Sequence, residues 1–462
     1  MGEINVKATL LYRVVWLLGV SYLFAFGVHQ SALAQEPSWA YEKWGDEASS
    51  ESDARVTAKK GLKGMDLLQR LTISGYGTMN YHNYLQHDLD PYTRNKIDME
   101  KFSLYMHYRL LPKLRLFTEV EYEHGGTGAS MEFDALEEAG EFEIEIEQGG
   151  EVKLEALYLD FAFHPLFNLR VGRAKIGVGL CNNFDRPNKH FTTTRIEGES
   201  TMIPSGWYET GLQAYGWMWG NRLSYQLSVT SGLDSSGFSG RNWIAGGYQT
   251  RFEMPQAEAF AFSGRLNYNF GKGRHSFVGQ SAYANNTNPN RPKNDLANTK
   301  AWVTIVGAHL ALREANWVVN GSFLWGNLQN SDVITQKNAN LSNSLNVKRR
   351  PIGKEVLTAS LEVGYNLFPL LGGRSTQALY PFLRYDYYDT MHRTTGNVIK
   401  DGRWERNTWA AGLNWMPNQY VVVKAHYTDR TFSQQHFDRV THEDMGHLKK
   451  EREVTIGVGF SF

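Results

Sequence analysis

The chain ends in "EREVTIGVGFSF", residues 451–462, a stretch that alternates apolar with small or polar side chains up to its last residue. One face carries Val454, Ile456, Val458, Phe460 and Phe462. The other face carries Thr455, Gly457, Gly459 and Ser461. A period of two is typical of a β-strand. A frayed chain end has no need of apolar side chains, so we expect this terminus to be held inside a sheet.

The same alternation recurs from Leu71 onward, in segments of about 10–14 residues that together make about sixteen strands. Short connectors such as "LPK" (111–113), "REA" (313–315) and "PNQ" (417–419) alternate with long ones. The long connectors span 125–150, 180–206, 234–256, 327–352 and 432–450. An even number of strands, with tight turns at one rim and long loops at the other, is typical of an outer-membrane β-barrel.

We therefore expect an all-β fold, a closed antiparallel transmembrane barrel over residues 71–462. A barrel that spans lipid must pair every backbone amide internally, so the last strand must pair with the first, "LTISGYGTMNY". Aromatic residues favour the membrane interface, and they crowd the predicted strand ends: Tyr105, Tyr108, Trp207, Trp217, Trp302, Trp317, Trp325, Tyr385, Tyr387, Trp409 and Trp415.

The first 34 residues have the features of a secretory signal peptide. Lys7 and Arg13 precede an apolar core at 14–28, and "ALA" at 32–34 supplies a small-x-small cleavage site. The alternative is an uncleaved anchor helix. Residues 35–70 are polar and of mixed charge, and we expect a flexible periplasmic lead-in. Cys181 is the single cysteine of the chain, which excludes an intramolecular disulfide.

Composition narrows the function further. Basic and acidic residues number 48 each, and this balance argues against a nucleic-acid partner. About sixteen strands leave a water-filled bore, and alternation gives that bore a lining of mixed charge without a decisive preference for anions or cations. The residues predicted to line it are Arg109, Arg115, Glu119, Glu121, Asp160, Arg170, Arg222, Arg265, Glu362, Arg384, Asp386 and Lys424. Arg170, Arg173 and Lys175 cannot all point inward without a bulge.

The connector 180–206 is the most informative loop. It is cationic at Arg186, Lys189 and Arg195, and acidic at Glu197 and Glu199. Folded into the barrel it would constrict the bore and place these charges beside the wall. The alternative is an ordinary loop that lies over the rim.

The block from residue 170 to residue 216 resembles the central segment of bacterial porins related to the phosphate-selective porins O and P. The matching positions are Val171–Gly172–Arg173, Arg186–Pro187, Ile203–Pro204, Trp207, Glu209 and Gly211. The resemblance implies a sixteen-stranded trimeric channel whose third extracellular loop lies inside the bore. Phosphate-selective members have a ladder of inward arginines and a lysine-rich collar. This chain departs from that pattern, because its lining mixes acids with arginines.

The resemblance and the sequence together predict a porin of the bacterial outer membrane, not an enzyme, with no cofactor and no metal. Small hydrophilic solutes or ions, including anions such as phosphate, would diffuse through it. The expected partners are outer-membrane lipid, lipopolysaccharide, two further copies, and the barrel assembly machinery, which the strand ending at Phe462 would engage. Two alternatives stay open: a barrel enzyme such as a lipase or protease, and an adhesive or structural barrel.

The acidic run at 132–151 is typical of a solvated loop. Its alternating part could instead extend a hairpin above the membrane, where its glutamates would bind divalent cations that bridge lipopolysaccharide.

Overall fold

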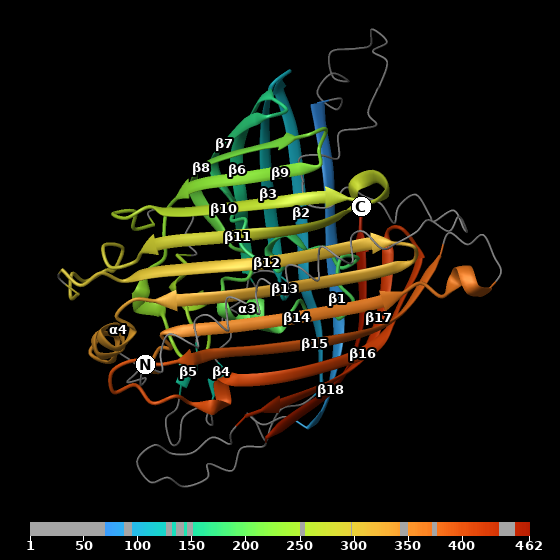
Figure 1. Ribbon diagram of the computed structural model, residues 1–462. Helices are drawn as coiled ribbons and strands as arrows, with labels where there is room; N and C mark the ends of the chain where they lie inside the picture. Colours follow the sequence, from blue (N-terminus) through green and yellow to red (C-terminus); the bar gives the residue numbers. More distant parts are fainter. Residues whose placement is uncertain are drawn as a thin grey trace, which may run out of the picture. The chain divides into compact units, whose positions relative to one another are not determined.

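The computed structural model describes residues 70–86, 95–125, 132–134, 143–145, 151–249, 255–296, 298–341, 350–371, 377–433 and 449–462. The predicted signal peptide, and the lead-in up to residue 69, lie outside the described residues. Within them, sixteen strands close into one antiparallel barrel (Figure 1). The prediction of a closed all-β barrel of about sixteen strands is confirmed.

The barrel strands follow one another around the wall in chain order. Their bounds are β1 (Leu71–Gln86), β2 (Lys96–Leu111), β3 (Leu114–Glu123), β6 (Glu151–His164), β7 (Phe167–Lys175), β8 (Tyr208–Met218), β9 (Leu223–Thr230), β10 (Ala261–Phe270), β11 (Ser276–Asn286), β12 (Trp302–Glu314), β13 (Trp317–Leu328), β14 (Glu355–Tyr365), β15 (Ala378–Arg393), β16 (Glu405–Asn418), β17 (Val421–Phe432) and β18 (Lys450–Ser461).

Strands β4 (Glu132–Asp134) and β5 (Glu143–Glu145) pair in a separate two-stranded sheet. This pairing agrees with the alternative in which the acidic run forms a hairpin. The described connections between strands contain short helices: η2 (Cys181–Asn183), α3 (Glu197–Met202), η3 (Ser235–Gly237), η4 (Ala245–Gly247), η5 (Lys272–Arg274), α4 (Ser331–Ala339), η6 (Phe368–Leu371) and η7 (Gly402–Trp404). Among these residues, no helix combines the length and the apolar composition needed to cross a bilayer.

The barrel closes where the last strand meets the first. Tyr76 is opposite Ser461 and Tyr81 is opposite Ile456 in the antiparallel register. The Gly75 amide donates to the Phe462 carbonyl, and the Phe462 amide donates back to the Gly75 carbonyl, each at 2.9 Å. The prediction that β18 pairs with β1 is therefore confirmed, down to the final residue.

Apolar side chains face outward around the barrel. At the carboxyl end, Ile456, Val458 and Phe460 of β18 and the following Phe462 are 39–51% exposed, whereas Thr455 on the opposite face is 1% exposed. Other strands repeat this arrangement, with large exposed side chains that include Ile73, Leu212, Phe262, Val306, Leu361, Leu383, Leu413 and Trp415. The two faces of the wall therefore differ in chemistry, as the alternation predicts.

The interior is not uniformly polar. Near the rim with the long loops, inward side chains such as Ile305, Leu324 and Val356 are fully buried. They join Trp207 and Trp243 from the connections in one apolar cluster. The alternation of the strands predicts a polar inner face, so this apolar interior differs from the expectation. The difference arises because the long connections fold against the inner face of the strands.

Phe462 offers a test of the closure. Its ring stacks with Phe102 at a centroid distance of 6.4 Å and covers Gly75, where an added Cβ would collide with it. Aromatic rings that cover strand glycines stabilise sheets. Phe462→Ala should lower the free energy of unfolding by about 1 kcal/mol, measured by urea titration of the folded barrel. Phe262→Ala removes an outward ring of similar exposure from β10 as the control, and an equal loss there would contradict this account.

Candidate functional site

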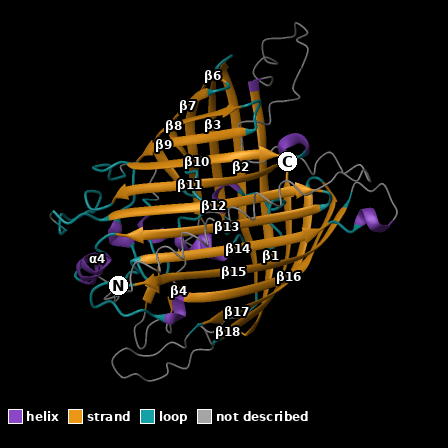
Figure 2. Cartoon of the chain, in the orientation of Figure 1, coloured by secondary structure: helices purple, strands orange, loops and turns teal. Residues whose placement is uncertain are grey.

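The connection between β7 and β8 lies inside the barrel, and residues 176–207 are called the inner segment below. Its helix α3 lies within the ring of strands (Figure 2). The segment contacts inward side chains of strands from β10 to β18. Space inside the barrel is tight for these contacts, because an added Cβ on Gly459 of β18 would collide with Pro187.

Basic wall residues hold the backbone of the inner segment. Lys424 of β17 donates to the carbonyls of His190 and Thr192, at 2.9 and 2.7 Å. Arg384 of β15 donates to the Thr194 carbonyl at 3.1 Å, and Arg265 of β10 donates to the Gly179 carbonyl at 2.5 Å. Buried charges need such hydrogen bonds, so these side chains act as fixed supports of the segment.

Polar residues of neighbouring strands make further hydrogen bonds to the inner segment. Asn320 of β13 donates to the Lys189 carbonyl at 3.1 Å and to Glu362 of β14 at 2.7 Å. Glu362 in turn accepts the Phe191 amide at 3.1 Å. The amide of Thr193 is 3.1 Å from Nε2 of His426 in β17. The segment therefore replaces water as the partner of the inner wall.

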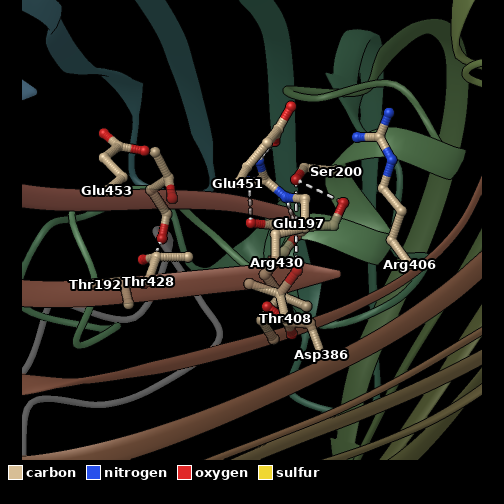
Figure 3. Close-up of polar contacts among 12 residues, drawn as sticks. Thr192, Glu197, Ser200, Asp386, Arg406, Thr408, Thr428, Arg430, Glu451 and Glu453 are labelled. Carbon is tan, nitrogen blue, oxygen red and sulfur yellow. Dashed lines mark hydrogen bonds and ion pairs between the residues drawn. The ribbon is translucent and has the colours of Figure 1, made fainter. Parts of the chain in front are cut away.

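A bidentate ion pair joins Glu197 in helix α3 to Arg430 of β17 (Figure 3). The guanidinium is bidentate: Nε lies 3.0 Å from Oε2 and Nη2 lies 2.5 Å from Oε1. Thr408 of β16 donates to the same carboxylate at 2.9 Å, and Arg430 also pairs with Glu451 of β18. One arginine thus links the inner segment to the last two strands.

These partners set the charge of Glu197. Burial by itself raises the pKa of a carboxyl group, but the Arg430 guanidinium and the hydrogen bonds outweigh it and lower the pKa of Glu197 to about 2. Glu199 on the same helix has neutral partners, since it accepts from Ser322 of β13 at 2.5 Å and from the Cys181 amide at 2.6 Å. Burial therefore raises the pKa of Glu199.

The inner segment also contacts β2, here through a cation–π interaction. The guanidinium carbon of Arg186 lies 5.7 Å from the centre of the Tyr105 ring. Asp185 beside it pairs with Lys175 and, at 2.6 Å, with Arg195. Although burial raises the pKa of Asp185, these two cations lower it below its usual value.

An aromatic row crosses the inner wall behind Arg186. Tyr76 and Tyr105 are 6.2 Å apart between ring centres, and Phe117 and Tyr158 are 4.8 Å apart. Arg170 continues the row, because its guanidinium lies 5.1 Å from the Tyr158 ring and 4.3 Å from the Tyr215 ring. The row spans neighbouring strands from β1 to β8 and gives this wall a different chemistry from that of β10–β18.

The structure divides the predicted pore residues into groups. Those that hold the inner segment or pair beside it are Arg265, Arg384, Asp386 and Lys424. Those in local pairs on the β3–β7 wall are Glu119, Glu121, Asp160 and Arg170. Those on the inner segment are Arg186, Lys189 and Arg195. Those near the rim with short turns are Arg109, Arg115 and Arg222, of which Arg222 lies in the β8–β9 turn, not in a strand.

Arg170, Arg173 and Lys175 cannot all point inward in a regular strand, and Gly172 provides the irregularity in β7. It has a φ of +133°, a conformation that favours glycine. Around it Arg170 donates to Gln213 at 2.9 Å and Arg173 donates to the Glu155 carbonyl at 3.0 Å, while Lys175 pairs with Asp185. The strand thereby gives each of the three cations a protein partner.

Sequence reasoning missed Arg430 as a partner of the inner segment. The signal was available, because the alternation that places Lys424 inward also places His426, Thr428 and Arg430 inward at intervals of two. The pairing of Arg430 with Glu197 could not be predicted from the sequence, because the two residues are 233 positions apart. Among the described residues, no group of three His, Cys, Asp or Glu side chains is arranged to hold a metal ion.

Comparisons with known proteins give remote likenesses. No family model matches the chain. An uncharacterized protein of Aquifex aeolicus (strain VF5) is 27% identical over 362 residues, covering 77% of this chain and 75% of that protein.

Among solved structures, Salmonella typhi OmpF in complex with daunomycin has a TM-score of 0.48 at 14% identity, covering 85% of this chain and 97% of its own. The outer membrane channel DcaP of Acinetobacter baumannii has a TM-score of 0.46 at 10% identity, covering 85% and 97%. An anion-selective porin from Comamonas acidovorans has a TM-score of 0.45 at 8% identity, covering 85% and 99%.

The low pKa of Glu197 predicts acid sensitivity. A carboxylate whose pKa falls on folding contributes stability above its ordinary value of 4.5 and loses it as the pH falls toward about 2. Glu197→Gln should therefore remove roughly 2–3 kcal/mol of the stability difference between neutral pH and pH 2. Urea titrations at a series of pH values measure this difference.

The matched control for that experiment is Glu258→Gln, which changes an exposed carboxylate outside the barrel strands. It should leave the pH dependence as in the unchanged protein. An identical acid transition in the Glu197→Gln variant and the unchanged protein would show that the pair with Arg430 does not anchor the inner segment.

Proposed function

We propose that the chain is a porin of the bacterial outer membrane, a channel through which small hydrophilic solutes diffuse passively. One observation carries the proposal: the barrel exposes apolar side chains outward and directs charged ones inward, around a segment that narrows the interior. An exposed apolar outer surface suits a hydrocarbon solvent. Inward charges suit an aqueous passage, in which ions remain solvated. The proposal assigns the chain no catalytic role.

The finer parts of the proposal rest on the sequence. Residues 1–34 direct export, the strand that ends at Phe462 engages the barrel assembly machinery, and three copies associate in a membrane with lipopolysaccharide. The inner segment, which includes residues 180–206, acts as the constriction. In the first half of this segment Arg186, Lys189 and Arg195 outnumber the acid Asp185, whereas Glu197 and Glu199 follow in helix α3. The cationic first half favours small anions, phosphate among them, over cations.

Planar bilayers test the channel directly. Purified protein should give discrete, ohmic conductance steps when it inserts between two salt solutions. Silent bilayers at high protein concentration would overturn the channel proposal. The same apparatus measures the reversal potential in a salt gradient, which reports the preference for anions or cations.

Removing two charges from the inner segment should change that preference. Arg186→Gln combined with Lys189→Gln should reduce the anion-to-cation permeability ratio about two- to fivefold, because a unit charge near the ion path contributes on the order of 1 kcal/mol. Lys300→Gln with Lys337→Gln removes the same charge from exposed positions at the rim with long loops and is the control. An equal shift in both pairs would show that the inner segment does not set selectivity.

A further inference from the structure

The outward face of strand β11 differs from that of its neighbours. β11 lies between β10 and β12 in the wall (Figure 1). On those two strands Phe262, Leu266 and Val306 are apolar and 43–53% exposed. β11 instead carries Gln280 and Ala282 at exposed positions. A side-chain amide therefore lies within a surface whose surroundings suit lipid.

The register of the sheet fixes the direction of that amide. Gln280 is paired with Leu266 of β10 and with Ala308 of β12. Paired residues direct their side chains to the same face, and Leu266 is 46% exposed on the outside. Gly279 faces the interior, because an added Cβ there would collide with His309, which is 2% exposed. The side chain of Gln280 thus points away from the barrel.

The depth of Gln280 in the membrane follows from the aromatic residues of the neighbouring strand. β12 begins at Trp302 and ends at Glu314, which is opposite Trp317. These two indoles are 37% and 47% exposed, and Trp residues at both ends of a strand mark the limits of the hydrocarbon layer. Ala308, opposite Gln280, is the middle residue of β12. Gln280 is therefore level with the middle of the apolar belt.

An amide at this level needs a polar partner. It carries two N–H donors and a carbonyl acceptor, and lipid chains can pair with neither. Among the residues that the structure describes, none forms a hydrogen bond with the side chain of Gln280. The partner must therefore come from outside the chain.

A second copy of the chain fits this requirement. Copies of one protein enter a membrane in the same orientation, so their Gln280 side chains lie at the same depth. Rotation about an axis along the membrane normal relates such copies. When β11 lies beside that axis, Gln280 of one copy meets Gln280 of the partner subunit. The amide is complementary to itself, because it both donates and accepts.

The side chains around Gln280 allow close approach. Ala282 and Ala308 are small, and the residue opposite Ala282 on β10 is Gly264. Small residues let the backbones of neighbouring chains approach each other in lipid. The outer faces of β15 and β16 instead carry Leu383 and Leu413, each 50% exposed. Large aliphatic side chains of that kind suit contact with lipid.

We propose that copies of this chain associate through the outer faces of β10, β11 and β12. β11 lies beside the symmetry axis, and the Gln280 amides of three copies form a hydrogen-bonded ring that is shielded from lipid. This inference rests on the proposed membrane location and association of three copies, and it identifies the face through which they meet.

Cross-linking tests the contact face. Cys181 is the chain's single cysteine, so Cys181→Ala gives a cysteine-free background. Ala282→Cys places a thiol on the proposed face, and Ala411→Cys, at an exposed alanine of β16, is the matched control. Protein in lipid vesicles is treated with bismaleimidoethane and analysed on denaturing gels. Ala282→Cys should give about tenfold more cross-linked dimer than Ala411→Cys, because an interface raises the effective concentration of its thiols.

Gln280→Leu tests the amide ring without any new cysteine. At an interface, the variant loses the hydrogen bonds between copies, and the association constant should fall about tenfold. At a lipid-facing position, leucine would suit the surroundings better than the amide, and association would not change. Native mass spectrometry over a dilution series in detergent measures the association constant. Conductance steps from the variant show that its barrel is folded.

The outcomes separate this inference from the channel proposal. Equal cross-linking of the two cysteine variants, or cross-linking at Ala411→Cys alone, would overturn the contact face while conductance still supports a channel. Unchanged association of Gln280→Leu would overturn the amide ring. Unchanged protein that stays monomeric in vesicles would overturn the whole inference. Silent bilayers from protein that cross-links through Ala282→Cys would overturn the channel and leave the contact face supported.

Discussion

Backbone hydrogen bonding around a closed ring is the constraint on which the rest of this protein depends. An open sheet edge would leave a row of amides and carbonyls without partners. The reciprocal bonds between Gly75 and Phe462 close that edge at the last residue. Closure fixes which face of every strand points outward, and it thereby fixes the alternation of apolar and polar side chains that the sequence displays.

The interior follows from that closure. A ring of this size encloses more volume than its own inward side chains fill, and charged residues there need either water or protein partners. The chain supplies protein partners over one part of the ring by folding residues 176–207 inward. Lys424, Arg384 and Arg430 then serve as supports, although their charges alone would suit an open aqueous lining equally well.

Most of the fold could be predicted from the sequence, because a period of two and the position of short turns are local properties. The same alternation places Arg384 and Lys424 on the inner face, where the structure has them. The alternation does not predict that these side chains donate hydrogen bonds to backbone carbonyls of the inner segment, because those contacts depend on how a loop packs against strands far away in sequence. The apolar cluster around Trp243 could not be predicted either, because its members come from several strands and several connections, and no single stretch of sequence shows a pattern.

The pairing of Glu197 with Arg430 has a consequence for how the molecule assembles. The helix that carries Glu197 follows the fifth strand of the ring, whereas Arg430 and Glu451 belong to its last two strands. The inner segment therefore lacks its final attachment until the carboxyl-terminal hairpin is in place. Contacts of such long sequence separation form late, so the lumen acquires its final shape only after the wall around it is complete.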